Sequence, residues 1–206
     1  MRIVFMGTPD FAVPTLEALN ESEHEIVGVV TAPDKPAGRG LRLRQSAVKQ
    51  YAEENGLTTL QPEKLRNEVF LADLKALNAE LFVIVAFRML PRVVWEMPPK
   101  GSINLHASLL PQYRGAAPIN WAIMNGETET GVTTFFLKHE IDTGNILFTE
   151  QVPINETDTA GDLHDRLMEV GAGVVKRTVD AISTGNYKEQ PQPATGDEQL
   201  KRAPKI

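Results

Sequence analysis

The most constraining feature of this sequence is a set of short apolar runs in its first half, separated by stretches with helical periodicity. The runs lie at residues 2–6, 25–31 and 81–86 and are rich in Val, Ile and Phe. Nearly continuous apolar runs of this length are typical of strands buried on both faces of a parallel sheet. Strands that alternate with helices favour right-handed βαβ crossovers. We therefore expect an α/β fold, Rossmann-like in its first half, with a mostly parallel central sheet flanked by helices.

Helix signals recur along the rest of the sequence. Ser46 is suited to cap a helix that continues to Asn55, and Gly56 stands where helices often end. The last helical pattern repeats its apolar residues every three or four positions, so one face should pack on the sheet; these residues are Leu163, Leu167, Val170, Val174 and Val175. This last helix is expected at 159–182. Further helices are expected at 11–20, 67–77, 91–97 and 118–125, and further strands at 58–60, 131–137 and 145–149. We expect residues 32–45 to form a polar loop.

Composition indicates an ordinary globular protein and excludes some kinds of chemistry. The chain has 206 residues, of which 42% are hydrophobic and 23% are charged, and it contains no cysteine. Disulfides, thiolate nucleophiles and cysteine-ligated zinc are therefore excluded. The net charge of −6 argues against indiscriminate nucleic-acid binding but leaves room for a local basic patch. The longest apolar run is too short to span a bilayer, and we expect a cytoplasmic monomer.

Two polar side chains, Asn104 and His106, stand two residues apart inside an apolar stretch. On a strand this spacing points both to one face, while Ile103 and Leu105 point to the other. An amide beside an imidazole is a plausible reactive pair, because the imidazole gains or loses a proton near neutral pH. The spacing alone fits two structural polar residues better. Similarly, the segment from Asp142 to Gly144 alone fits an ordinary turn, in which glycine accepts positive φ.

Three motifs together change this interpretation. Asn104-Leu-His-Ala-Ser-Leu-Leu-Pro111, Tyr113-Arg-Gly-Ala-Ala-Pro118 and Glu140-Ile-Asp-Thr-Gly144 closely resemble the formyltransferases that use 10-formyltetrahydrofolate, and within that family the branch that acts on methionyl-tRNA in translation initiation. The resemblance covers essentially the whole chain. It implies a Rossmann-like formyltransferase domain at residues 1–182. Residues 183–206 would form a C-terminal arm or the start of an interdomain linker, without the family's C-terminal β-barrel domain.

The resemblance also implies which residues are catalytic, namely Asn104, His106 and Asp142. Formyl transfer places negative charge on the formyl oxygen, which the Asn104 amide and a protonated His106 could stabilise. Asp142 could accept a hydrogen bond from His106 and take a proton from the attacking amine, directly or through water. The reaction needs no metal ion, and the remaining histidines show no spacing typical of metal ligands.

A basic segment precedes the first capped helix. Between residues 34 and 49 there are five basic residues against one acid, a local charge of +4. Composition alone fits a solvated flexible loop better than a binding site. The stretch at 33–40, however, is similar to the loop with which the methionyl-tRNA branch grips the acceptor arm. The resemblance therefore implies tRNA binding by Lys35, Arg39, Arg42 and Arg44, with Arg39 entering the arm.

Two further segments correspond to those that line the family's folate pocket. The first, at 87–90, follows the buried strand at 81–86, and Phe87 and Arg88 replace the family's tyrosine and glycine there. The second lies at 108–111, after Asn104 and His106. The resemblance implies that the folate co-substrate is bound by Phe87, Arg88, Met89, Leu90, Ser108, Leu109, Leu110 and Pro111. A dinucleotide cofactor is not expected, because the segment from Gly7 to Asp10 lacks the glycine pattern of a dinucleotide-binding turn.

Two alternatives remain open at this point. The first is a related formyltransferase that acts on an amino sugar nucleotide or on glycinamide ribonucleotide. The second is a folate-binding or RNA-binding module without turnover. The basic segment argues against the first alternative, and the presence of all three catalytic residues argues against the second.

Overall fold

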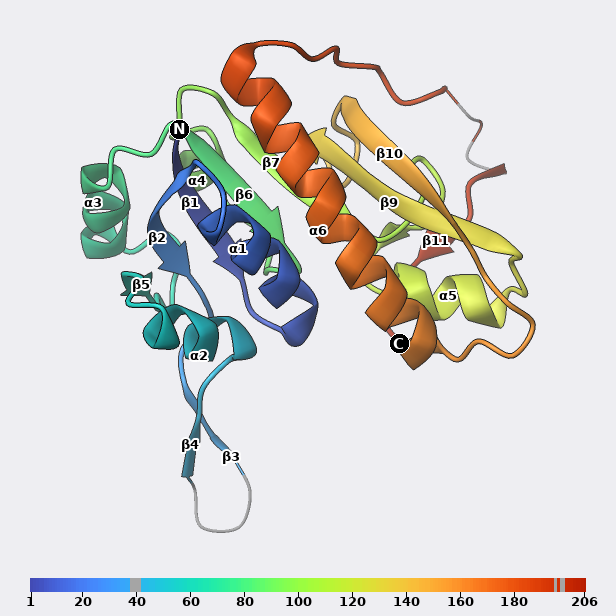
Figure 1. Ribbon diagram of the computed structural model, residues 1–206, viewed down its shortest axis with the longest axis horizontal. Coiled ribbons are helices and arrows are strands. Elements are labelled where there is room, and N and C mark those ends of the chain that lie inside the picture. Colours follow the sequence, from blue (N-terminus) through green and yellow to red (C-terminus); the bar gives the residue numbers. More distant parts are fainter. Residues whose placement is uncertain (38–41, 195, 197–198) are drawn as a thin grey trace. The chain divides into compact units, whose positions relative to one another are not determined.

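The computed structural model describes residues 1–37, 42–194, 196 and 199–206 (Figure 1). The chain forms two compact units, Met1–Ser102 and Ile103–Ile206.

A parallel sheet forms the centre of the first unit. Its strand order is β6-β1-β2-β5, and neighbouring strands are parallel throughout. Every residue of β6 is buried, which requires cover on both faces of the sheet. The bounds are Arg2–Gly7 for β1, Glu25–Val30 for β2, Thr59–Leu60 for β5 and Leu81–Val85 for β6. The parallel strands predicted from the apolar runs are confirmed.

Side-chain caps start two helices of this unit. Ser46 Oγ accepts a hydrogen bond from the Lys49 backbone N–H at 3.0 Å, and Asn67 Oδ1 accepts one from the Phe70 N–H at 3.1 Å. Gly56 has a φ of +65° just after the first of these helices, as expected for a helix end. The helices are η1 (Asp10–Ala12), α1 (Val13–Asn20), α2 (Ala47–Glu54), α3 (Glu68–Ala76) and α4 (Arg92–Trp95). Helices α1 and α2 lie side by side (Figure 1).

The segment predicted to be a polar loop contains a β-hairpin instead. Strands β3 (Lys35–Ala37) and β4 (Arg42–Arg44) pair in antiparallel fashion, with Lys35 opposite Arg44. Each strand has three residues and carries charged side chains, so the segment lacks the apolar alternation that predicts a strand. The prediction of a loop was therefore wrong for these residues.

An antiparallel sheet forms the second unit. Its order is β10-β9-β7, with β7 at Ser102–His106, β9 at Glu129–Phe136 and β10 at Ile146–Pro153. Strand β7 begins on the last residue of the first unit. Strand β10 runs four residues past its predicted end. The apolar pattern did not predict this extension, because it contains exposed polar residues such as Glu150 and Gln151. Helix α5 spans Pro118–Met124, with proline in its first turn as predicted.

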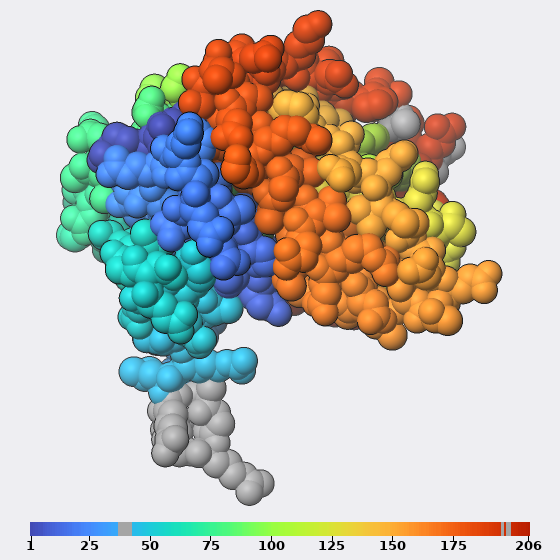
Figure 2. Space-filling model, in the orientation of Figure 1, coloured from blue at the N-terminus to red at the C-terminus, as the bar shows by residue number. Residues whose placement is uncertain are grey.

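The long helix α6, Ala160–Thr184, packs one face on this antiparallel sheet. Thr159 and Asp162 form a reciprocal capping box at its start, and Gly185 ends it with a φ of +71°. Of the five residues predicted to face the sheet, four are buried and Val170 is half-buried. Asp165, on the outer face, is exposed. Figure 2 shows the helix, in orange, at the surface. Within the described residues no helix, α6 included, has both the length and the apolar character needed to cross a membrane.

The segment after α6 contacts earlier elements of the second unit. Strand β11 (Arg202–Ala203) pairs in parallel with β8 (Arg114–Gly115). The indole of Trp121 donates a hydrogen bond to the Pro204 carbonyl at 2.8 Å. Neither two-residue strand was expected from the sequence, because two residues show no periodicity. The boundary at residue 182 between the catalytic domain and the arm remains a prediction.

Candidate active site

Strand β7 presents Asn104 and His106 on one face and its apolar residues on the other. Ile103 and Leu105 are buried, and a Cβ built on Gly171 of α6 would lie 2.6 Å from a Leu105 methyl carbon, so this face packs closely on the helix. Asn104 and His106 therefore point away from α6. Asn104 is half-buried, and its side-chain amide forms no hydrogen bond within the described residues. That amide is available to a ligand.

The orientation of His106 is fixed by a backbone group. Its Nε2 lies 2.7 Å from the carbonyl oxygen of Tyr113. Because a carbonyl oxygen only accepts, Nε2 must carry the proton of this hydrogen bond. The nitrogen left for chemistry is Nδ1, which lies 3.8 Å from Oδ2 of Asp142. Both side chains are mostly buried, with 8% and 11% of their surfaces exposed.

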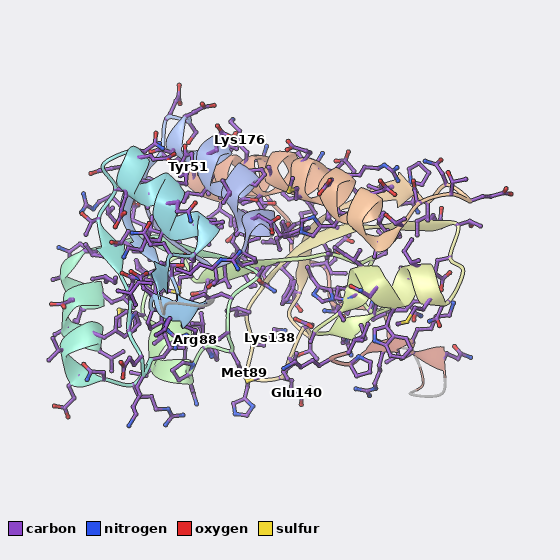
Figure 3. The ribbon with its side chains drawn as sticks, turned by 90° about the horizontal axis from the view of Figure 1, so that it is seen from below. Tyr51, Arg88, Met89, Lys138, Glu140 and Lys176 are labelled. Carbon is purple, nitrogen blue, oxygen red and sulfur yellow. The ribbon has the colours of Figure 1, made fainter. Side chains whose placement is uncertain are left out.

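Asp142 lies in the loop between β9 and β10, in which Figure 3 labels Lys138 and Glu140. Its φ of +54° is uncommon for a residue other than glycine. The backbone N–H of Gly115 donates to its Oδ2 at 3.0 Å. This hydrogen bond and the neighbouring His106 both involve Oδ2. Within the described residues, Oδ1 is thus the carboxylate oxygen left for an incoming group.

The glycine of this loop has a different role from the one expected. Asp142, rather than Gly144, adopts the positive φ, and the expectation for Gly144 was wrong. Gly144 is required for space, because a Cβ built on it would lie 1.6 Å from the carbonyl oxygen of Phe136.

The structure thus brings His106 and Asp142 together and places Asn104 on the same strand face as His106. Two supporting groups were missed from sequence, namely the Tyr113 carbonyl and the Gly115 N–H. Both are backbone groups, which carry no side-chain signal. They do lie in the motif Tyr113–Pro118, which was singled out for its resemblance to the family.

A hydrogen-bonded cluster surrounds the side chain of Tyr113. The Tyr113 hydroxyl and the Lys201 ammonium both donate to the Glu127 carboxylate, and Asn125 donates to the Tyr113 oxygen at 2.9 Å. The contacts with Lys201 and then Tyr113 lower the pKa of Glu127. Burial, followed by the contact with Glu127, raises the pKa of Tyr113. The cluster anchors the residue whose carbonyl orients His106.

The predicted folate-binding residues fall into two groups in different units. In the first unit, the Arg88 guanidinium donates to the backbone carbonyls of Pro62 and Glu63 and lies 5.3 Å from the centre of the Phe87 ring. Burial lowers the pKa of Arg88. Arg88 is therefore hydrogen-bonded to the loop at residues 62–63. Met89, also labelled in Figure 3, is exposed and accessible to a ligand.

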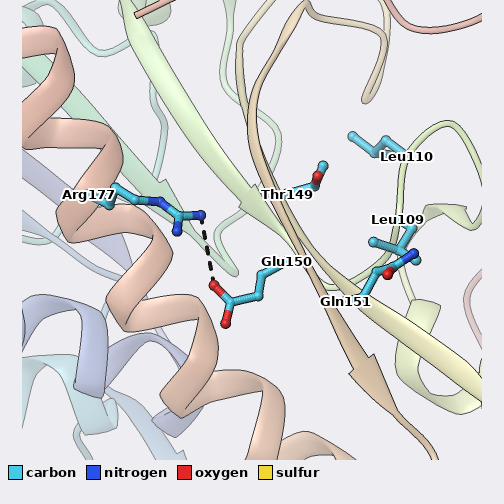
Figure 4. A pocket seen from close by; sticks show the side chains of 6 residues that line it. All are labelled: Leu109, Leu110, Thr149, Glu150, Gln151 and Arg177. Atoms are coloured by element: carbon cyan, nitrogen blue, oxygen red, sulfur yellow. Dashed lines mark ion pairs between the residues drawn. The ribbon is translucent and has the colours of Figure 1, made fainter. Parts of the chain in front are cut away.

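The second group follows β7. Ser108 is fully buried, and its hydroxyl donates to the Gln112 carbonyl at 2.6 Å. Leu109 and Leu110 line a pocket of about 630 Å³ together with Thr149, Glu150, Gln151 and Arg177 (Figure 4). An ion pair of 3.8 Å joins Glu150 to Arg177 there. The lining of this pocket does not include any of the three candidate catalytic residues, so this pocket is not the candidate site of chemistry.

The candidate nucleic-acid interface is the β3–β4 hairpin. Lys35 and Arg44 are exposed, Arg42 is described only as backbone of β4, and Arg39 lies outside the described residues. At the base of the hairpin, Lys49 Nζ donates to Asp34 Oδ2 at 2.7 Å, which lowers the pKa of Asp34 and raises that of Lys49. Lys49 is therefore paired within the protein.

A chain with this α/β fold and these residues on β7 and the β9–β10 loop belongs to the formyl transferase family, whose sequence profile matches residues 1–179. Among individual proteins, it is 58% identical to the methionyl-tRNA formyltransferase of Bacteroides fragilis over 208 residues. That match covers 100% of this chain and 64% of the relative. The chain thus spans less than two thirds of the length of this relative.

Solved formyltransferase structures share the fold. Phosphoribosylglycinamide formyltransferase of Anaplasma phagocytophilum superposes with a TM-score of 0.78 at 21% identity, covering 100% of this chain and 99% of that one. An N-formyltransferase of Helicobacter canadensis, in complex with folinic acid and dTDP-3-aminofucose, superposes with a TM-score of 0.69 at 24% identity, covering 98% of this chain and 70% of that one. The predicted fold class is confirmed.

Proposed function

We propose that this chain transfers the formyl group of 10-formyltetrahydrofolate to the amino group of methionyl-tRNA. The observation that carries the proposal is the approach of His106 Nδ1 to Asp142 Oδ2 at 3.8 Å, on the strand face that also presents the free amide of Asn104. Relatives that are 54% to 59% identical over this region are named methionyl-tRNA formyltransferases, which supports the choice of acceptor.

The reaction needs one bond to form and one to break. The folate donor supplies the formyl group. A bond forms between the acceptor nitrogen and the formyl carbon, and the bond between that carbon and the folate nitrogen breaks. The acceptor nitrogen loses a proton and the folate nitrogen gains one, so the reaction needs a proton acceptor, a proton donor and a group that stabilises charge on the formyl oxygen.

The residues of this chain fit those needs. The amide of Asn104 has hydrogen atoms free to donate to the formyl oxygen. Asp142 Oδ1 is open to accept a proton from the acceptor amine. His106 Nδ1 lies close enough to Asp142 for a proton to pass between them through a water molecule, and a protonated His106 would also stabilise the charged oxygen.

We propose further that the β3–β4 hairpin binds the tRNA. Lys35 and Arg44 lie opposite each other on its two strands with exposed side chains, which suits contact with phosphates. Arg39 and Arg42 belong to the same segment and are assigned to this interface by resemblance. The Asp34–Lys49 pair supports the base of the hairpin.

A turnover assay tests the proposal by comparing methionyl-tRNA, an amino sugar nucleotide and glycinamide ribonucleotide as acceptors. We expect the highest kcat/KM with methionyl-tRNA. Asp142→Asn keeps the shape of the side chain and should lower kcat by about 100-fold or more, because the proton acceptor is lost. A preference for another acceptor would overturn the substrate, and a nearly normal rate in Asp142→Asn would overturn the mechanism.

A further inference from the structure

The segment that follows α6 reaches the loop that carries Asp142. The backbones of Gln190 and Ile146 exchange hydrogen bonds of 2.7 and 2.9 Å just after that loop. Further along, the Tyr113 N–H donates to the Lys201 carbonyl at 2.6 Å, and β11 pairs with β8. Gln192 lies between these two anchored points, so its position is constrained from both sides.

The side chain of Gln192 is fully hydrogen-bonded. Its Nε2 donates to the carbonyls of Asp142 at 2.6 Å and Gly144 at 2.9 Å. Its Oε1 accepts from the Arg114 guanidinium, from Nε at 3.1 Å and from Nη2 at 2.5 Å. A flipped amide would place its oxygen against two carbonyls and its NH2 group against a cation. The partners therefore allow one orientation only.

Arg114 lies between the two residues that hold the catalytic side chains. The carbonyl of Tyr113 orients His106, and the N–H of Gly115 binds the Asp142 carboxylate. Through Arg114 and Gln192, the same tripeptide also holds the backbone of Asp142. Three consecutive residues, 113–115, therefore fix the positions of His106, the Asp142 carboxylate and the Asp142 main chain relative to one another.

We propose that Gln192 is a positioning residue for Asp142. The main chain of Asp142 has an uncommon φ of +54°, and the amide of Gln192 stabilises this conformation by binding the carbonyls on both sides of Thr143. Arg114 orients the amide. Gln192 touches no reacting atom in this scheme; it sets the direction of the carboxylate that does. The inference rests on the proposed function for the role of Asp142.

The test is a mutant cycle on the whole chain, measured by formyl transfer from 10-formyltetrahydrofolate to methionyl-tRNA. Gln192→Ala removes two hydrogen bonds to the loop and should lower kcat by about 10- to 100-fold while KM for each substrate changes by less than about threefold. Arg114→Met should lower kcat by a smaller factor. The double variant should be no slower than Gln192→Ala, because both residues act through the same contact.

Gln190→Ala is the matched control, because Gln190 lies on the same segment and its hydrogen bonds in the described structure are formed by its backbone. It should keep the parent kcat. If Gln192→Ala does not fold, Gln192→Met keeps the side-chain volume and removes the same donor. A kcat within twofold of the parent, or multiplicative effects in the double variant, would overturn the role of Gln192. If the parent formylates a different acceptor, the proposed function fails, and the same comparison with that acceptor still tests the positioning role.

Discussion

A single methyl group added at Gly144 tests how strictly this site depends on the path of its loop. Gly144 lies two residues after Asp142, and its Cβ would stand 1.6 Å from the carbonyl oxygen of Phe136 and 2.9 Å from a ring carbon of Phe135. Contacts of a Cβ below 3.0 Å essentially do not occur. In Gly144→Ala the backbones at residue 144 and Phe136 must therefore move apart by about 1.4 Å, the difference between 3.0 and 1.6 Å.

A shift of this size exceeds what a catalytic site tolerates. Catalytic groups must be held within about 0.5 Å of their productive positions, and a displacement of about 1 Å costs on the order of 100-fold in rate. The shift would also disturb the hydrogen bond from Gln192 to the Gly144 carbonyl. We therefore expect Gly144→Ala to lower kcat by about 100-fold. Overpacking should lower the free energy of unfolding by about 1–3 kcal/mol.

The assay combines steady-state formyl transfer with urea unfolding. Gly173→Ala is the control, because Gly173 lies in α6 and a Cβ there would meet no atom within 4 Å. This control should keep the parent kcat and raise the free energy of unfolding by about 0.5–1 kcal/mol, since alanine favours a helix over glycine. A folded Gly144→Ala protein whose kcat stays within threefold of the parent would refute the argument.

Three other predictions concern tRNA binding, pH and the core. Lys35→Ala and Arg44→Ala should weaken tRNA binding and each reduce the slope of log K against log salt by about one unit, measured by filter binding; an unchanged slope would contradict phosphate contact. Because the pKa of Glu127 is lower in the folded state than its ordinary 4.5, its stabilising effect is present above pH 4.5 and is lost as pH falls through the folded value. The stability difference between the parent and Glu127→Gln should therefore shrink below pH 4.5 in urea unfolding, and a constant difference would exclude the effect. Leu167→Ala, at a fully buried position of α6, should lower the free energy of unfolding by about 2–5 kcal/mol; a loss below 1 kcal/mol would show that α6 packs less tightly than described.

The hairpin shows where sequence reasoning failed on the fold. The buried parallel strands were predictable because burial on both faces leaves a continuous apolar run, and the long helix because burial of one face leaves apolar residues every three or four positions. Strands β3 and β4 leave neither signal, since each has only three residues and their pairing is made by backbone groups. Strands β8 and β11 were not predicted for the same reason. Each has two residues, and the two strands, far apart in the sequence, pair through main-chain hydrogen bonds.

For the site, the sequence by itself determined the catalytic candidates Asn104, His106 and Asp142. Their side chains form motifs that resemble a family, and the two-residue spacing on a strand set the shared face of the first two. The tertiary structure alone decided how they are held. The Tyr113 carbonyl and the Gly115 N–H come from one short segment, and the Gln192 amide reaches the site from a distant one; the carbonyl and N–H are backbone groups that every sequence carries. Sequence records which side chains are present, whereas the direction of a hydrogen bond depends on the path of the whole fold.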